Sequence, residues 1–144
     1  MGRFAYSFAV FGLFFITACG GDEPPTISIA VTPTAFGTGG QTTLTVTVTH
    51  FSLVDPSHTH ALTTADHVDV EESNGTLTAS EGHYHVYLDT TEQNPLLMAW
   101  TPQVQVSVEG SPGPHQLIVR LNANDHRFLK PEVKDQAEIM LLEE

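Results

Sequence analysis

Residues 41–51 read Gln-Thr-Thr-Leu-Thr-Val-Thr-Val-Thr-His-Phe and alternate between threonine and aliphatic side chains over most of their length. On an extended backbone, Leu44, Val46 and Val48 face one side and the intervening threonines face the other. β-branched residues repeating with a period of two favour a strand over a helix. We therefore predict a strand over 41–51 with one buried face, and with His50 at its end on the apolar side.

Shorter segments with the same alternation lie on both sides of this strand. The dipeptide Asn74-Gly75 separates two of them and predicts a hairpin turn. Residues 33–40 are rich in turn residues, and 52–82 are irregular outside the hairpin. The other predicted strands cover 26–32, 67–72, 76–79, 83–89, 96–100, 104–108, 115–121 and 136–142; the last also fits a helical turn or two.

About seven to nine short strands, with no long helical period, predict an all-β fold and an antiparallel β-sandwich. The segment 112–121, Pro-Gly-Pro-His-Gln-Leu-Ile-Val-Arg-Leu, resembles the penultimate strand of immunoglobulin-like and fibronectin-type domains. The resemblance implies an immunoglobulin-like β-sandwich over 26–144. Because Cys19 is the only cysteine, the form of that fold with an internal disulfide is excluded.

The N-terminus carries a targeting pattern. A short positive start is followed by an apolar run and then by Ile-Thr-Ala-Cys at 16–19. These are the marks of a secretory signal, and the last four residues resemble the lipobox of bacterial lipoprotein precursors. The resemblance implies a lipoprotein signal peptide over 1–18, a lipid, palmitate included, on Cys19, and a polar tether over 19–25.

The same resemblance implies a place in the cell. Gly20 and Gly21 follow the cysteine without an aspartate, which resembles the pattern sorted to the outer membrane of Gram-negative bacteria. We expect a cell-envelope protein that is exported to the periplasm and held at a membrane by its lipid. The apolar segment is too short to span a bilayer. A net charge of −12 excludes nucleic acid as a partner, because that contact needs a basic surface.

The eight histidines all follow Cys19, and their spacing predicts a metal site. His83 and His85 lie two apart on a predicted strand, so both rings point to one face, roughly 7 Å apart. In an antiparallel sandwich, strand direction brings most of the histidines to one end. The predicted ligands are His83, His85 and His126, with His50 and His60 in reserve and with Asp125 and Asp89 orienting the rings.

Nitrogen ligands without a thiol favour Cu or Zn. Met98 near the histidines would favour copper, although a lone methionine also serves as an apolar filler. His58, His60 and His67 form at most a looser site in an irregular stretch. His115 is expected instead to bond back to the preceding turn, as the tyrosine corner of such domains does.

Two further resemblances bear on this pattern. The segments 82–89 and 113–126 resemble small uncharacterised bacterial exported domains that pair a Gly-His-x-His strand with a Gly-x-His strand and an Asp-His turn. Copper–zinc superoxide dismutases also hold copper with His-x-His on a strand. This chain lacks the rest of that pattern, so dismutase activity is not inferred.

The residues together predict a lipid-anchored envelope protein that binds Cu or Zn for capture or delivery. The alternative is a non-metal immunoglobulin-like module that binds another envelope protein. No motif for a nucleophile, a phosphate loop or a zinc protease is present, so we do not expect an enzyme. Histidine ligands must be neutral, so binding is expected to weaken below about pH 6.

Overall fold

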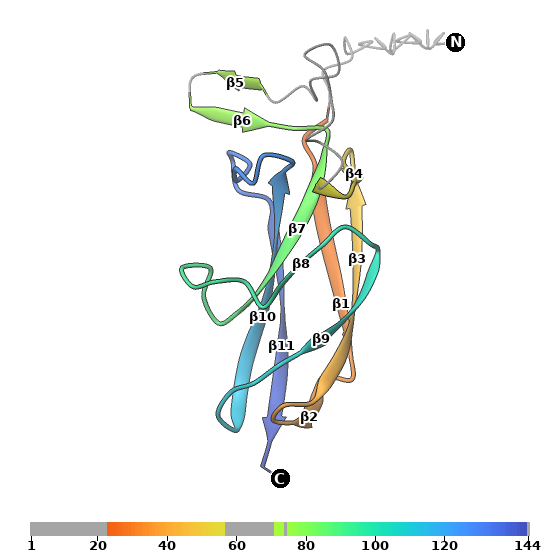
Figure 1. The fold of residues 1–144 in the computed structure, drawn as a ribbon, viewed down its shortest axis with the longest axis vertical. Helices are drawn as coiled ribbons and strands as arrows, with labels where there is room; N and C mark the ends of the chain where they lie inside the picture. Colours follow the sequence, from red (N-terminus) through yellow and green to blue (C-terminus); the bar gives the residue numbers. More distant parts are fainter. Residues whose placement is uncertain (1–22, 57–70, 74, 144) are drawn as a thin grey trace, which may run out of the picture.

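The computed structural model describes residues 23–56, 71–73 and 75–143, which form an all-β fold (Figure 1). Among these residues, no helix is long and apolar enough to cross a membrane. The strands are β1 (Thr26–Thr32), β2 (Ala35–Gly37), β3 (Gln41–Thr49), β4 (Ser52–Leu53), β5 (Glu71–Ser73), β6 (Thr76–Thr78), β7 (Glu81–Leu88), β8 (Leu97–Ala99), β9 (Gln103–Ser107), β10 (Gly113–Ala123) and β11 (Lys134–Leu142).

The strands form two main sheets and a small hairpin. The smaller sheet has the order β1-β3-β9, and the larger has the order β2-β11-β10-β7-β4, with β8 paired to β7 as well. Most pairs are antiparallel, but β2 runs parallel to β11 and β4 runs parallel to β7. The hairpin of β5 and β6 bridges to the β10–β11 connection through Leu77 and Lys130.

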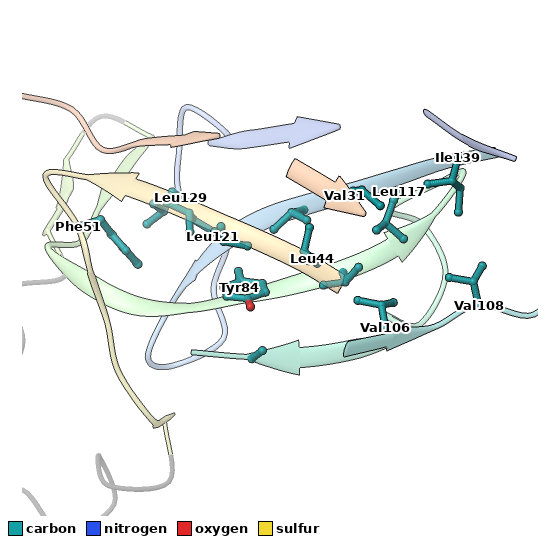
Figure 2. Close-up of a cluster of buried hydrophobic side chains, with 14 of the residues drawn as sticks. Val31, Leu44, Phe51, Tyr84, Val106, Val108, Leu117, Leu121, Leu129 and Ile139 are labelled. Atoms are coloured by element: carbon teal, nitrogen blue, oxygen red, sulfur yellow. The ribbon is translucent and has the colours of Figure 1, made fainter. Parts of the chain in front are cut away.

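Side chains of both main sheets share one apolar core (Figure 2). Leu44 and Val106 of the smaller sheet are fully buried, as are Val86 and Leu117 of the larger sheet. The threonine–aliphatic alternation of β3 therefore gives one face to this core and the other to solvent. Burial of aliphatic surface is the main force that holds the two sheets together.

From Leu117 to its end, strand β10 is buried on both faces. Leu117, Val119 and Leu121 point into the core, while Arg120 and Asn122 point the other way and are still buried. A guanidinium and an amide do not leave water without partners. The outer face of β10 therefore carries buried polar side chains, and the candidate site lies on that face.

The structure confirms most of the predicted strands. β11 is a strand and not a helical turn, and β5 and β6 form the predicted hairpin around Gly75, which has a φ of 81°. β3 ends at Thr49, so the prediction that it runs to Phe51 is wrong. His50 has a φ of 54°, outside the extended region that a strand needs.

Two short strands, β2 and β4, lie where turns or irregular chain were expected. Both are added to an edge by pairing with a distant strand, which a local pattern does not reveal. Residues 57–70, with His58, His60 and His67, lie outside the described residues. Residues 1–22 also lie outside the described residues. The signal peptide, the lipidation of Cys19 and the domain limits therefore stay predictions.

Candidate metal centre

The site begins with a row of polar side chains across two neighbouring strands. In β7, Tyr84, Val86 and Leu88 face the core, so His83, His85 and Tyr87 face outward. The antiparallel register places Asn122 of β10 opposite His83, and Arg120 opposite His85. Directly opposed residues share a face of the sheet. These five side chains therefore lie together on the outer face of the larger sheet.

Three imidazoles meet at one end of this row. The His83 and His85 rings have centroids 5.0 Å apart, and the His126 ring lies 4.7 Å from His83 and 6.0 Å from His85. One ligand nitrogen from each residue can be chosen so that all three lie within 4.8 Å of one another. His83 is fully buried, His85 half-buried and His126 exposed, so the cluster runs from the interior to the surface.

A tight turn after β10 brings His126 to the other two rings. The Ala123 carbonyl accepts from the His126 amide at 2.9 Å, and the Ala123 amide donates to the Arg127 carbonyl at 3.0 Å. The Asn122 side-chain amide also donates to the His126 carbonyl, at 3.2 Å. His126 has a φ of 66°, an unfavourable region for a residue with a side chain. Such a conformation is held by its surroundings and is frequent at functional positions.

The distance between the two strand histidines fits a shared metal ion. Their Nε2 atoms are 3.1 Å apart, close enough for one ring to donate a hydrogen bond to the other when no ion lies between them. Two nitrogens bound at about 2.0–2.1 Å to one tetrahedral ion lie about 3.3 Å apart, and about 2.9 Å apart at a right angle. The observed separation falls between these values.

Burial keeps two of the rings neutral. Desolvation lowers the pKa of His83 to about 4, and the neighbouring His85 and His126 add to the effect. Desolvation also lowers the pKa of His85 to about 4, with further contributions from His126 and Arg120. A neutral imidazole has a free lone pair, which a metal ligand requires. For these two ligands, proton competition is therefore expected at lower pH than the sequence alone indicated.

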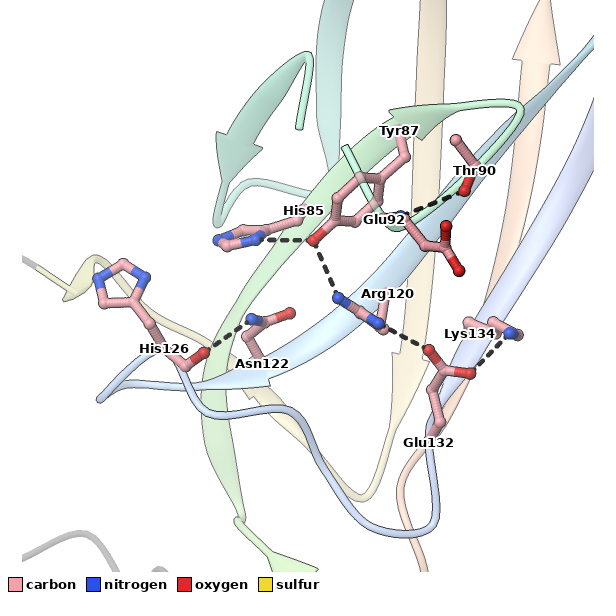
Figure 3. Close-up of polar contacts among 9 residues, drawn as sticks. All are labelled: His85, Tyr87, Thr90, Glu92, Arg120, Asn122, His126, Glu132 and Lys134. Carbon is pink, nitrogen blue, oxygen red and sulfur yellow. Dashed lines mark hydrogen bonds and ion pairs between the residues drawn. The ribbon is translucent and has the colours of Figure 1, made fainter. Parts of the chain in front are cut away.

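A chain of hydrogen bonds supports His85 from behind (Figure 3). His85 Nδ1 lies 3.2 Å from the Tyr87 hydroxyl, which accepts from Arg120 Nη2 at 3.1 Å. Arg120 Nη1 donates to Glu132 at 2.9 Å, and Glu132 also pairs with Lys134. With a metal on Nε2, the Nδ1 proton of His85 would donate to the Tyr87 oxygen. Partners of this kind fix the tautomer and orientation of ligand histidines.

The buried Arg120 is enclosed as well as hydrogen-bonded. Its guanidinium carbon lies 3.4 Å from the Phe128 ring centroid and 5.2 Å from that of Tyr87. A cation between two aromatic faces is stabilised by their electron density. Because Glu132 balances its charge, Arg120 can lie opposite His85 without leaving an unpaired charge in the layer.

His83 has a potential partner of its own. Its Nδ1 is buried without a hydrogen-bond partner, and so is the side-chain oxygen of Asn122. The two residues are directly opposed in the β7–β10 register. With a metal on His83 Nε2, the ring proton would reside on Nδ1 and need an acceptor. Asn122 Oδ1, on the neighbouring strand, is a buried acceptor that also has no partner.

Gly82 lets β10 approach β7 closely beside this cluster. A Cβ atom at Gly82 would overlap the carbonyl oxygen of Asn122 and lie 2.9 Å from the Phe51 ring. A larger residue would push apart the strands that carry the histidines. This explains a glycine directly before His83.

The remaining predicted site residues that the structure describes lie outside the cluster. His50 lies away from the cluster because it follows β3, which belongs to the opposite sheet. Its Nε2 pairs with Glu23 at 2.9 Å. Asp125 binds the side chain and amide of Arg127 within its own turn. Asp89 binds His115 at the far end of β7. Neither aspartate contacts His83, His85 or His126 through these bonds, whereas the Tyr87 hydroxyl does contact His85.

His115 forms the predicted contact with the preceding turn. Its Nε2 lies 2.7 Å from the Ser111 carbonyl, and its Nδ1 lies 2.7 Å from an Asp89 carboxylate oxygen. Both partners are acceptors, so only the doubly protonated ring donates to each. The hydrogen bond to Asp89, followed by that to Ser111, raises the pKa of His115. His115 is thus a structural clamp and not a ligand.

Sequence reasoning had named His83, His85 and His126, and the structure brings these three together. It had not named Tyr87, which follows His85 by two residues on the same face of β7, nor Arg120 and Asn122, which become neighbours of the histidines only through the β7–β10 register. No family model, curated protein or solved structure matches this chain. Its function is therefore inferred from the geometry of the histidine cluster itself.

Proposed function

We propose that this protein binds one Cu or Zn ion through His83, His85 and His126. The observation that carries the proposal is the convergence of three imidazoles, two from strand β7 and one from the turn after β10, with ligand nitrogens within 4.8 Å of one another. Copper and zinc are the metals that imidazole-only sites favour. The lowered pKa of His83 and of His85 leaves both rings ready to bind at neutral pH.

The position of the cluster supports capture or delivery of the ion. His83 is buried and His126 is exposed, so an ion can enter or leave from the surface without unfolding the sheet. The net charge of −12 raises the local concentration of cations around the molecule.

The proposal includes a lipid anchor and an immunoglobulin-like fold. The anchor is inferred from Ile-Thr-Ala-Cys at 16–19, and it would hold the metal site at a membrane of the cell envelope. The residues Gly20 and Gly21 after the cysteine favour the outer membrane. The immunoglobulin-like assignment is supported by strand order. β1-β3-β9 facing β11-β10-β7-β8, with β2 added parallel to β11, agrees with the sheet composition of such domains.

The test is stoichiometric metal content. The untagged full chain is loaded with Cu or Zn, desalted and measured by elemental mass spectrometry beside His85→Ala and His126→Ala. His126 is exposed and its replacement leaves no buried cavity, so that variant should fold. His50→Ala is the matched control, because it removes a histidine that lies outside the cluster.

One equivalent of metal in the wild type and in His50→Ala, with loss in the two cluster variants, is the expected result. Equal retention in all four proteins would place the metal elsewhere. A wild type that binds no metal would favour the non-metal interaction module. The exposed Leu96 and Trp100, next to the edge strand β8, would then be the first surface to examine.

A further inference from the structure

Strand β8 places a methionine beside the histidine cluster. In the antiparallel register of β7 and β8, Met98 is directly opposite His85. Its neighbours Leu97 and Ala99 oppose Val86 and Tyr84 and pack against the core. Met98 therefore points to the outer face, the same face as His85. The Cβ atoms of residues opposed in this way lie about 4.5–5.5 Å apart.

Met98 and His126 flank the two strand histidines from opposite sides. β7 has β10 on one side and β8 on the other, and His126 comes from the turn after β10. The long, flexible methionine side chain has three rotatable bonds and can adjust to a nearby ion. Met98 is 39% exposed, so it does not serve as a filler of the apolar core.

We propose that the Met98 thioether is the fourth ligand of the site and makes it selective for Cu(I). This inference rests on the proposed metal binding by His83, His85 and His126. Thioether sulfur is a soft ligand that favours Cu(I), whereas Zn(II) sites use thiolate, imidazole or carboxylate. Three imidazoles and one thioether would give Cu(I) four donors without any negative charge from the protein ligands.

The experiment compares Met98→Leu with the wild type. Leucine keeps the volume of methionine and removes the sulfur. Met140→Leu is the matched control, because Met140 is 38% exposed on β11, away from the cluster. Cu(I) affinity is measured anaerobically by competition with a chromogenic Cu(I) chelator, and Zn(II) affinity with a Zn(II) indicator. Trp100, the only tryptophan, lies two residues from Met98 and gives a fluorescence signal for binding.

Met98→Leu is expected to weaken Cu(I) binding by about tenfold or more while leaving Zn(II) binding unchanged. X-ray absorption of the Cu(I) protein should show a sulfur neighbour in the wild type and in Met140→Leu, but not in Met98→Leu. Unchanged Cu(I) affinity in Met98→Leu, or equal losses for both metals, would overturn the role of Met98. A wild type that binds neither metal would instead overturn the proposed function, so the two failures are distinguishable.

Discussion

Tyr87 and Asn122 lie next to the proposed metal ligands without belonging to them. The Tyr87 hydroxyl lies 3.2 Å from His85 Nδ1, and the Asn122 oxygen lies on the strand opposite the unpartnered Nδ1 of His83. The Tyr87 oxygen could accept the Nδ1 proton of a metal-bound His85, and the Asn122 oxygen is a buried acceptor without a partner on the neighbouring strand. The surroundings of the histidines therefore depend on the pairing of β7 with β10 as well as on the histidine spacing.

Replacing Tyr87 with phenylalanine tests this support. We expect Tyr87→Phe to lower metal affinity about 10- to 100-fold, because the orienting partner of His85 is lost. Competition titration with a metal indicator measures the change. Tyr84→Phe is the control on the same strand. Its hydroxyl bonds to the Thr101 carbonyl in the core, so its loss should cost about 1 kcal/mol of stability and leave affinity unchanged. Equal affinities in wild type and Tyr87→Phe would contradict the orienting role.

At the scale of strands, the close approach of β7 and β10 positions the histidine cluster. Gly82 permits it, since a Cβ there would overlap the backbone of Asn122. Gly82→Ala is expected to lower the free energy of unfolding by about 1–3 kcal/mol, the usual cost of forcing extra volume into a packed site. Gly110→Ala should cost less, because its Cβ would meet the flexible end of Leu141 at 3.0 Å. Urea denaturation measures both, and equal losses would count against the explanation.

The clamp between Asp89 and His115 joins the end of β7 to the start of β10 and makes stability depend on pH. The pKa of His115 is raised, so its contribution is full below the unfolded value of about 6.5 and is lost as the pH rises through the raised value. Desolvation acts to raise the pKa of Asp89, but hydrogen bonds from the Gln116 amide and from His115 outweigh it and lower the value. That contribution is lost only in acid, as the pH falls through the lowered value.

Thermal unfolding of wild type and His115→Gln as a function of pH checks this clamp. The two melting temperatures should differ most between about pH 4 and about pH 6.5 and converge at alkaline pH. The difference should correspond to about 1 kcal/mol or less, since the Asp89 carboxylate is 49% exposed. A constant difference up to alkaline pH would show that the imidazolium is not involved.

For the molecule as a whole, local sequence patterns predicted the strands, whereas the pairing of distant strands determines which residues surround the histidines. The alternation of 41–51 and of 115–121 was sufficient to predict β3 and most of β10. The pair His83 and His85 followed from the period of two, and His126 followed from strand direction. The positions of Arg120, Asn122 and Met98 depend on pairing registers between distant segments, and so does the exclusion of His50, which follows a strand of the other sheet.

The predicted lipid anchor is also a property of the whole chain. Wild type expressed in a Gram-negative host is expected in the membrane fraction, with a mass increased by covalent lipid, and Cys19→Ser is expected to lose both features. A stable membrane attachment needs more than one acyl chain, so the mass should show several. A wild type found wholly in the soluble fraction without lipid would contradict the anchor and leave the metal site unaffected.

The position of the metal itself is the most direct test of the account. A crystal of the full chain loaded with Cu or Zn, measured at the absorption edge of that metal, gives an anomalous map that locates the ion without assumptions about ligands. One peak is expected among the rings of His83, His85 and His126, about 2.0–2.1 Å from a nitrogen of each. A peak elsewhere in the protein, or loaded protein with no peak among these rings, would contradict the central claim.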